Sequence, residues 1–391
     1  MSVVKLLKDL IAIPSVNPMG QDVDGPEYLE AGMTEYLERW FTELGVEFHR
    51  IELQPQRSNI VARYVGNPDR PIVLLDAHQD VVPVEGMTIP PFVPEERDGR
   101  IYGRGACDVK GGMASMLTTF ARVVREQPVD AGDVIMSCSC DEEHQMSGIA
   151  KFADGWGDSS GDVPDWVSRR PDLAIIAEPT SLDIVVAHRG VTRWKLRVTG
   201  RASHSSKPSE GINAIYRMAK VVGHLEEYAA QLERDSVPHA MVGTPTLSVG
   251  RILGGISVNV VPPECSIEID RRVIPGEDQA VVIDHVAAFL RDRLDFEFKM
   301  LPPWSEVRFL PDGGNMELAD RLMTHVEPVA GRREKIGVPY GTNAAATAAA
   351  GVPTVVFGPG AIAQAHTKDE WIEAAQLAQA SEILFRFLST P

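Results

Sequence analysis

The sequence contains little cysteine, with four residues among 391. Cys107, Cys138, Cys140 and Cys265 are too few and too scattered to form a disulfide framework or a cysteine-based zinc site. We therefore expect free thiols, a reducing compartment and a cytoplasmic protein. Cys138 and Cys140 alternate within one apolar run, so we expect both on one strand face as small buried residues.

An excess of positive charge is also missing. Lysine and arginine together number 38 against 55 acidic residues, for a formal net charge of -17. Nucleic acid is excluded as a partner, because binding it requires a basic surface that displaces counterions. No stretch approaches the ~20 consecutive apolar residues of a membrane-spanning helix. Residues 1–18 predict a short amphipathic helix and a loop instead of a secretory signal, so we expect no membrane partner.

Short apolar runs are present in the first half of the chain, at residues 71–82, 133–140 and 172–177. Runs that are almost continuously apolar are typical of strands buried on both faces. Between the first two, residues 111–127 carry apolar side chains at helical spacing. This pattern predicts an α/β fold in which a mostly parallel sheet is covered by helices.

A different pattern begins at residue 189. The predicted order is a strand, a long amphipathic helix (212–235), two strands in which apolar and polar residues alternate, a helix (279–294) and a strand. This βαββαβ order is that of the ferredoxin-like motif. The first pattern returns after Pro302 and Pro303. We therefore predict a catalytic domain formed by residues 1–188 and 302–391, interrupted by an inserted domain at 189–301.

Histidine and carboxylate residues follow the apolar runs. His78 and Asp80 end the first run, Glu142 and Glu143 follow the second, and Glu178 follows the third. Because parallel strands place their carboxyl ends at one edge of a sheet, we expect these residues to lie close together. Such ligands suit zinc or a similar divalent ion. Glu142 and Glu143 point in different directions, and their repulsion raises one pKa, as a general base requires.

Two further candidates lie outside these runs. Asp108 belongs to the glycine-rich segment GRGACDVKGG and precedes a predicted helix, where it is either an N-cap or a metal ligand. His366 lies in a loop after a fourth apolar run. Each candidate, taken alone, is equally typical of an ordinary polar surface. Their recurrence after four successive apolar runs favours a metal site.

The order and spelling of these motifs resemble the family of dinuclear zinc hydrolases that includes acetylornithine deacetylase, succinyl-diaminopimelate desuccinylase, aminoacylase and carboxypeptidase G. The resemblance spans nearly the whole chain. The motifs that carry it are HQDVVP, GRGACDVKGG, DEE, AEPT, ASHSSKP, NVVPPE, DRRVIPGE, YGTNA and GPG followed by AHTKDE. It implies a zinc-exopeptidase-like catalytic domain with an inserted lid and dimerisation domain.

The resemblance also implies a role for each candidate around two zinc ions per subunit, although cobalt or manganese would suit the same ligands. One ion would be bound by His78 and Glu178 and the other by Glu143 and His366, with Asp108 bridging both. Asp80 would orient His78. Glu142 would be the general base that takes a proton from the bridging water and passes one to the leaving amine.

In the inserted domain, the resemblance implies a homodimer. His204 would reach the partner subunit's active site and stabilise the oxyanion, and Asn259 would also be contributed across the dimer. Arg272 would bind a substrate carboxylate, because guanidinium groups pair with carboxylates through two hydrogen bonds. Its neighbour Arg271 is expected to face outward if the strand alternates, unless the register reverses the two residues. Thr342 of YGTNA is expected at the substrate pocket.

Two residues depart from the family pattern. Gln145 stands where the family often has glycine, and Asn343 stands where it usually has aspartate. The second change would remove a charge near the expected substrate pocket. Neither position is a predicted ligand, so both changes bear on the substrate more than on catalysis.

The expected activity is zinc-dependent removal of the acyl group from a small N-acyl amino acid, of the acetylornithine deacetylase or succinyl-diaminopimelate desuccinylase type. A carboxypeptidase G-like exopeptidase or a dipeptidase would share every ligand, and the sequence does not separate these alternatives. A non-catalytic metal-dependent binding or assembly protein would have lost the base or a ligand, whereas Glu142 and all five ligands are present.

Overall fold

The structure is a computed structural model that describes residues 2–157 and 163–390. Its contacts divide the chain into two compact units. Unit 1 comprises the described parts of Met1–Ala187, Pro311–Gly337 and Thr342–Pro391, and unit 2 comprises His188–Leu310 and Val338–Gly341. Among the described residues, no helix combines the length and the apolar character needed to cross a membrane.

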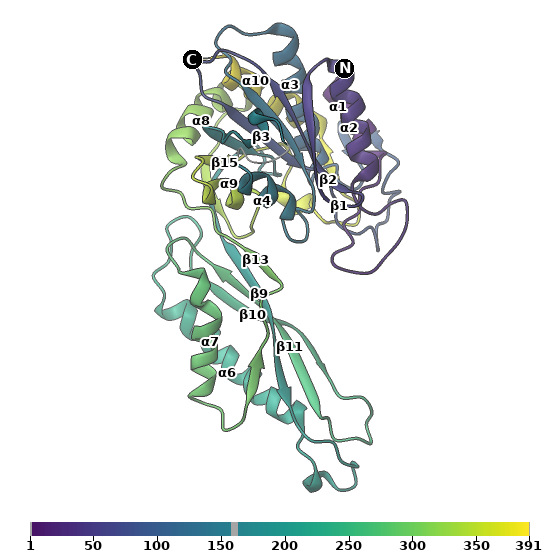
Figure 1. Cartoon of the computed structure of the whole chain (residues 1–391), viewed down its shortest axis with the longest axis vertical. Helices are drawn as coiled ribbons and strands as arrows, with labels where there is room; N and C mark the ends of the chain where they lie inside the picture. Colours follow the sequence, from purple (N-terminus) through teal and green to yellow (C-terminus); the bar gives the residue numbers. More distant parts are fainter. Residues whose placement is uncertain (1, 158–162, 391) are drawn as a thin grey trace. The chain divides into compact units, whose positions relative to one another are not determined.

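Unit 1 is an α/β unit (Figure 1). Its helices are α1 (Val3–Ile11), α2 (Ala31–Leu44), α3 (Lys110–Glu126), α4 (Ser147–Asp154), α5 (Asp165–Ser168), α8 (Met316–Ala330), α9 (Ala344–Ala349) and α10 (Ala374–Ser389). Its large sheet contains β1 (Glu47–Gln54), β2 (Arg57–Tyr64), β3 (Val73–His78), β6 (Val134–Ser139), β7 (Leu173–Ile176), β8 (Ile184–His188), β14 (Lys335–Val338) and β15 (Thr354–Val356). A smaller sheet contains β4 (Glu95–Arg97), β5 (Arg100–Tyr102) and β16 (Trp371–Glu373).

The strands of the large sheet lie in the order β1-β2-β6-β3-β7-β15-β8-β14. The central strands β6, β3, β7 and β15 are parallel to their neighbours in this group. Pairing is antiparallel between β1 and β2, between β2 and β6, and between β15 and β8. The predicted α/β class is confirmed, but the sheet is mixed, with its parallel part confined to the centre.

The central strands are the apolar runs of the sequence. Every residue of β3 and of β6 is buried, as expected for strands covered on both faces. Helix α3 packs on β3 and against α1 and α10, and the rings of Phe41 in α2 and Phe120 in α3 meet edge to face at 6.0 Å. Polar residues follow these apolar strands at the carboxyl ends of β3, β6 and β7.

Unit 2 has the βαββαβ order expected from the sequence, formed by β9 (Gly190–Thr199), α6 (Ala214–Asp235), β10 (Thr246–Gly254), β11 (Glu264–Val273), α7 (Val282–Arg291) and β12 (Phe298–Met300). The strands lie in the order β10-β11-β9-β12 and pair antiparallel. Helices α6 and α7 pack together beside the sheet (Figure 1). The core between them is centred on fully buried Trp194, Leu196 and Ile267.

Unit 2 extends further along the chain than the expected boundary at residue 302. Strand β13 (Ser305–Val307) pairs with β9, and Leu310 N–H donates to the His188 carbonyl at 3.1 Å. These backbone hydrogen bonds keep the chain in unit 2 until Pro311, where it returns to unit 1.

Candidate metal centre

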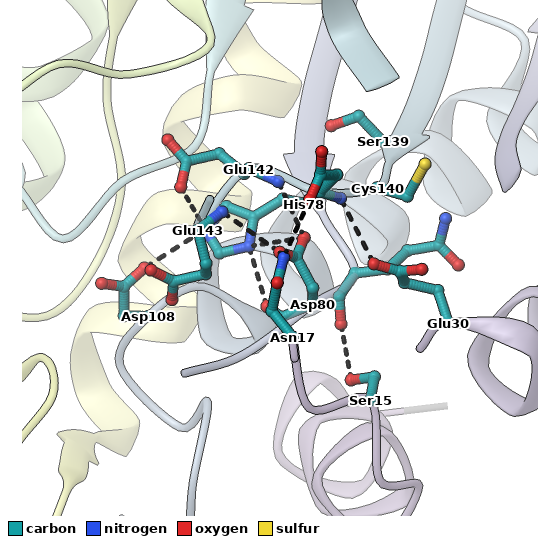
Figure 2. Close-up of polar contacts among 12 residues, drawn as sticks. Ser15, Asn17, Glu30, His78, Asp80, Asp108, Ser139, Cys140, Glu142 and Glu143 are labelled. Carbon is teal, nitrogen blue, oxygen red and sulfur yellow. Dashed lines mark hydrogen bonds and ion pairs between the residues drawn. The ribbon is translucent and has the colours of Figure 1, made fainter. Parts of the chain in front are cut away.

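The carboxyl edge of the parallel strands gathers the candidate ligands. His78 is the last residue of β3, while Glu142 and Glu143 follow β6 and Glu178 follows β7. Ligand atoms of His78, Glu142 and Glu178 lie within 4.8 Å of one another, and so do those of His78, Asp108 and Glu143. Figure 2 shows the side chains of His78, Glu142, Glu143 and Asp108 converging.

The tautomer of His78 follows from its contacts. Its Nδ1 lies 2.9 Å from the backbone carbonyl oxygen of Asp80, which can only accept a hydrogen bond. Without a metal, the hydrogen bond between Nε2 and Asp108 raises the pKa of His78 well above its usual range despite burial. A neutral ring would carry its proton on Nδ1 and direct the lone pair of Nε2 toward the carboxylates. This is the form in which histidine binds a metal.

Asp108 lies between the two histidines. Its Oδ1 is 3.2 Å from Nε2 of His78, and its Oδ2 is 3.2 Å from Nε2 of His366. The His366 nitrogen is also 3.2 Å from Oε2 of Glu143. A carboxylate that turns one oxygen to each histidine has the arrangement of a ligand shared by two ions.

The potential at this edge is strongly negative. Burial raises the pKa of Glu142 well above its usual range, and repulsion from Glu143 and Asp108 adds to the effect. Burial also raises the pKa of Glu143 to about 7. Hydrogen bonds with Asp108 and Glu143 raise the pKa of His366 to about 11. The field that favours a proton on His366 would equally favour a metal cation beside it.

The donor set fits a pair of divalent cations. Asp108, Glu142 and Glu178 are at most 8% exposed, and Oε1 of Glu143 is buried without a hydrogen-bond partner among the described residues. Buried carboxylates require a compensating charge. Two imidazoles with several carboxylates suit zinc, and also cobalt or manganese.

The Asp80 carboxylate was expected to orient His78, but Asp80 contacts His78 through its backbone carbonyl group. Its carboxylate binds the segment after β6. Its Oδ1 accepts the backbone N–H of Glu142 and its Oδ2 that of Glu143, both at 3.1 Å. Nδ1 of His78 is 3.7 Å from the nearer carboxylate oxygen, beyond hydrogen-bond distance. Asp80 therefore positions the candidate base and a candidate ligand at once.

A buried polar network behind Asp80 was not predicted from the sequence. Asn17 donates to Oδ2 of Asp80 at 2.8 Å and to Asp141 at 3.1 Å. Arg57 pairs with the same Asp141 oxygen at 2.5 Å and with Glu30 at 3.1 Å. These side chains come from segments that are distant in the sequence. Among them, only Asp141, the first residue of DEE, belongs to a motif that is recognisable in the sequence.

The candidates of the inserted domain lie in unit 2. The segments of His204 and Asn259 are adjacent, because Ser205 N–H donates to the Asn259 carbonyl at 3.0 Å. Arg272 is paired with Asp270, at 2.7 Å from its Nε. The expectation that Arg271 faces outward is wrong. Arg271 is 2% exposed and pairs with Glu277, because strand alternation places it in phase with the apolar residues of β11.

In the YGTNA segment, Thr342 and Asn343 are both buried. Thr342 is fully buried, and its Oγ1 accepts the N–H of Ala344, the first residue of α9. Asn343 is 1% exposed and donates to Asp76 and to Ser139, each at 2.9 Å. The presence of asparagine where the family usually has aspartate therefore changes contacts in the protein interior. Gln145 is exposed beside His144.

Comparison with known proteins gives consistent results. The profile of peptidase family M20/M25/M40 matches residues 74–390. Acetylornithine deacetylase from Photorhabdus laumondii is 31% identical over 399 residues, covering 98% of this chain and 96% of that protein. An M20 family metallo-carboxypeptidase from Sulfolobus solfataricus has a similar fold, with a TM-score of 0.77, 17% identity and coverage of 100% and 99%. So does a dinuclear metal binding peptidase of the M20 family from Bacillus subtilis, with a TM-score of 0.66, 18% identity and coverage of 99% and 96%.

Proposed function

Because the chain belongs to peptidase family M20/M25/M40 and is a metal-dependent hydrolase of amide or peptide bonds, we propose that it removes the acyl group from a small N-acyl amino acid. The relative named acetylornithine deacetylase, which aligns with 98% of this chain, supports this substrate class. The observation that carries the proposal is the position of Asp108 between His78 and His366, with Glu142 beside them.

We propose that this centre binds two zinc ions. The ligands would be His78 and Glu178 for one ion, Glu143 and His366 for the other, and Asp108 for both. When bound, the ions would supply the Lewis acidity that polarises the scissile carbonyl and acidifies water. Nε2 of His78 is available for this role because Nδ1 donates to the Asp80 carbonyl.

Glu142 would be the general base. Its Oε2 lies 3.9 Å from Nε2 of His78, next to the ligands. Its backbone is held by Asp80, so the carboxylate has a defined position. The raised pKa, caused by burial, lets this group accept a proton from the attacking water and deliver it to the leaving amine nitrogen.

Substrate recognition and a homodimer through unit 2 are part of the same proposal. Arg272 would bind the substrate carboxylate, and His204 and Asn259 would act across the dimer. Strand β10 lies at the edge of its sheet, and apolar side chains at and beside it are exposed, including Leu253 at 51% and Val258 at 99%. An exposed apolar edge strand is a surface that native proteins cover. Light scattering on the purified protein would measure the mass, and a monomer would contradict this part.

The decisive experiment compares the wild type with Glu142→Ala after zinc loading. Hydrolysis of N-acetyl amino acids, N-succinyl amino acids and dipeptides would be followed, and bound metal would be counted by mass spectrometry. We expect turnover of an N-acyl substrate by the wild type, and a loss of several orders of magnitude in the variant with about two metals retained. Turnover of dipeptides alone would instead identify an exopeptidase. Absence of turnover on the whole panel would reject the proposed activity.

A further inference from the structure

The carboxylate of Glu370 lies in a nest of backbone N–H groups formed by the segment that carries Asp108. Its Oε1 accepts the N–H of Cys107 at 2.8 Å and that of Asp108 at 3.0 Å. Its Oε2 accepts the N–H of Gly105 at 3.0 Å. Glu370 is fully buried. The Glu370 side chain therefore determines the path of the backbone from Gly105 to Asp108, whose carboxylate faces both histidines.

Gly105 allows this path. Its φ is +80°, in the left-handed region, and a Cβ atom there would lie 2.7 Å from the Val81 side chain. Only glycine adopts this conformation without strain and without a steric clash. The glycine of the GRGACD motif and the glutamate of AHTKDE are thus two parts of one arrangement.

Arg104 neutralises Glu370 and extends the arrangement to two other loops. Its Nη1 is 2.9 Å from Oε2 of Glu370 and 3.2 Å from the carbonyl oxygen of Thr367. Its Nη2 donates to the carbonyl of Pro83 at 3.1 Å. The guanidinium group is buried, with Arg104 3% exposed. Buried charge-assisted hydrogen bonds of this kind have well-defined geometry.

The three loops joined in this way each carry a residue of the metal centre. Pro83 follows Asp80 by three residues, Thr367 is next to His366, and Arg104 belongs to the segment of Asp108, whose N–H is bound by Glu370. Both carboxylate oxygens of Glu370 are occupied by backbone N–H groups, and Oε2 also contacts Arg104. The contacts of Glu370 hold the residues that would bind the ions, and Glu370 does not belong to that set.

We infer that Glu370, together with Arg104, is a positioning residue for the two-metal centre and sets the orientation of the bridging carboxylate of Asp108. This inference rests on the proposed function for the identity of the bridging ligand. Partners that orient metal ligands typically contribute about 10–100-fold to metal affinity or activity. A purely structural anchor would change stability without changing metal affinity.

The test uses the full-length protein and three variants. Glu370→Gln keeps the size of the side chain but replaces one acceptor by an NH₂ group that faces backbone donors. Glu373→Gln is the matched control, because Glu373 belongs to the adjacent strand β16, and its side chain, 48% exposed, is 3.9 Å from Arg100. Arg104→Lys keeps the charge but cannot reach Glu370, Thr367 and Pro83 together.

Zinc affinity would be measured by competition with a chromogenic chelator, and the visible absorption of the cobalt-loaded protein would report ligand geometry. We expect Glu370→Gln to bind zinc about 10–100-fold more weakly, to alter the cobalt spectrum, and to lower kcat with little change in KM, while Glu373→Gln matches the wild type. Unchanged zinc affinity and cobalt spectrum in Glu370→Gln, with only a lower melting temperature, would overturn the inference.

If Glu370→Gln does not fold, the same measurements on Arg104→Lys would test the inference. We expect this variant to bind zinc more weakly than the wild type. Unchanged zinc affinity would contradict the inference. Zinc affinity is independent of the substrate. A wild type that turns over no N-acyl substrate would therefore reject the proposed activity, while the comparison of zinc affinities would still decide the role of Glu370.

Discussion

Nδ1 of His78 donates a hydrogen bond to the backbone carbonyl of Asp80, at 2.9 Å. A main-chain partner leaves the Asp80 carboxylate available for another task, and this carboxylate accepts the N–H groups of Glu142 and Glu143. The orientation of the histidine and the orientation of the acidic segment are thus controlled by two different groups of one residue. A substitution of the Asp80 side chain can therefore change the orientation of the acidic segment without changing that of His78.

We predict that Asp80→Asn disturbs the acidic segment and leaves His78 in place. The asparagine NH₂ group would face the backbone donors of Glu142 or Glu143, so one of these hydrogen bonds would be lost. We expect kcat to fall about 10–100-fold and metal to be lost mainly from the position that Glu143 would ligate. Metal analysis and steady-state kinetics would check this. Loss of both ions together would indicate that the carboxylate also holds His78.

Much of the candidate site could be predicted from the sequence, because its candidate ligands follow apolar runs that form adjacent parallel strands. His78, Glu142 and Glu178 each come after such a run, and parallel pairing of β6, β3 and β7 brings the strand ends together. The ferredoxin-like order of unit 2 followed in the same way from the alternation and length of its segments. These features depend on local patterns that the chain displays directly.

The remaining features depend on contacts that no local pattern encodes. Asn17 reaches Asp80 across 63 residues, and Arg104 reaches Glu370 across 266. The burial of Arg271 was missed although Ile267 and Ile269 have the same strand phase, because the expectation assigned the inward-facing position to its neighbour Arg272. The contact of Asn343 with Asp76, a residue of β3, likewise joins positions 267 residues apart.

The buried pairing of Arg57 with Glu30 and Asp141 predicts a large effect on stability. Arg57→Met would leave two buried carboxylates without their cation, which costs about 3–5 kcal/mol. Arg70→Met is the control, because Arg70 and Asp130 form an exposed pair at 2.7 Å, and such pairs contribute about 0–1 kcal/mol. Urea unfolding monitored by circular dichroism would measure both. Similar free energies of unfolding for the two variants would contradict the prediction.

Removal of metal is predicted to destabilise unit 1. Without a cation, Asp108, Glu142, Glu143 and Glu178 repel one another in a buried site. We expect chelation to lower the melting temperature and added zinc to restore it, because a ligand that binds the native state stabilises it. In the metal-free protein, Glu142→Gln should melt at a higher temperature than the wild type, because a carboxyl group whose pKa is raised by burial destabilises the folded state at neutral pH. A lower melting temperature of this variant would show that the contacts of the Glu142 carboxyl group outweigh the cost of its burial.

The buried histidine of unit 2 predicts a dependence of stability on pH. Burial lowers the pKa of His188 to about 4, and its Nε2 has no hydrogen-bond partner among the described residues. Between pH 4 and the unfolded pKa of about 6.5, the unfolded chain binds the proton more tightly. This contribution to stability is therefore complete above pH 6.5 and is lost as the pH falls toward 4.

Comparison with His188→Gln isolates this effect. Between pH 7.5 and pH 5, we expect the free energy of unfolding of the wild type to fall by about 2 kcal/mol more than that of the variant. Both proteins have the same carboxylates and the same metal centre, so acid effects from those groups cancel in the difference. Parallel pH profiles would show that His188 is protonated without cost in the folded state.

Asn343 and Asp76 form a buried donor and acceptor pair, at 2.9 Å from Nδ2 to Oδ2. Asn343→Asp, which restores the residue usual in the family, would place a second carboxyl group against Asp76 and remove a donor. We expect a loss of about 1–3 kcal/mol. The loss should be larger at pH 8 than at pH 5, because a shared proton would raise the folded pKa of the pair.

The exchange Asp76→Asn with Asn343→Asp should recover most of that loss, because it restores one donor and one acceptor in reversed positions. The coupling free energy from a double-mutant cycle would measure the recovery, with about 0.5–3 kcal/mol expected for residues in contact. Additive effects would show that each side chain is stabilised by other neighbours, such as Ser139. Since neither residue is a candidate ligand, zinc content should be the same in all four proteins, and any stability change would then report the buried pair alone.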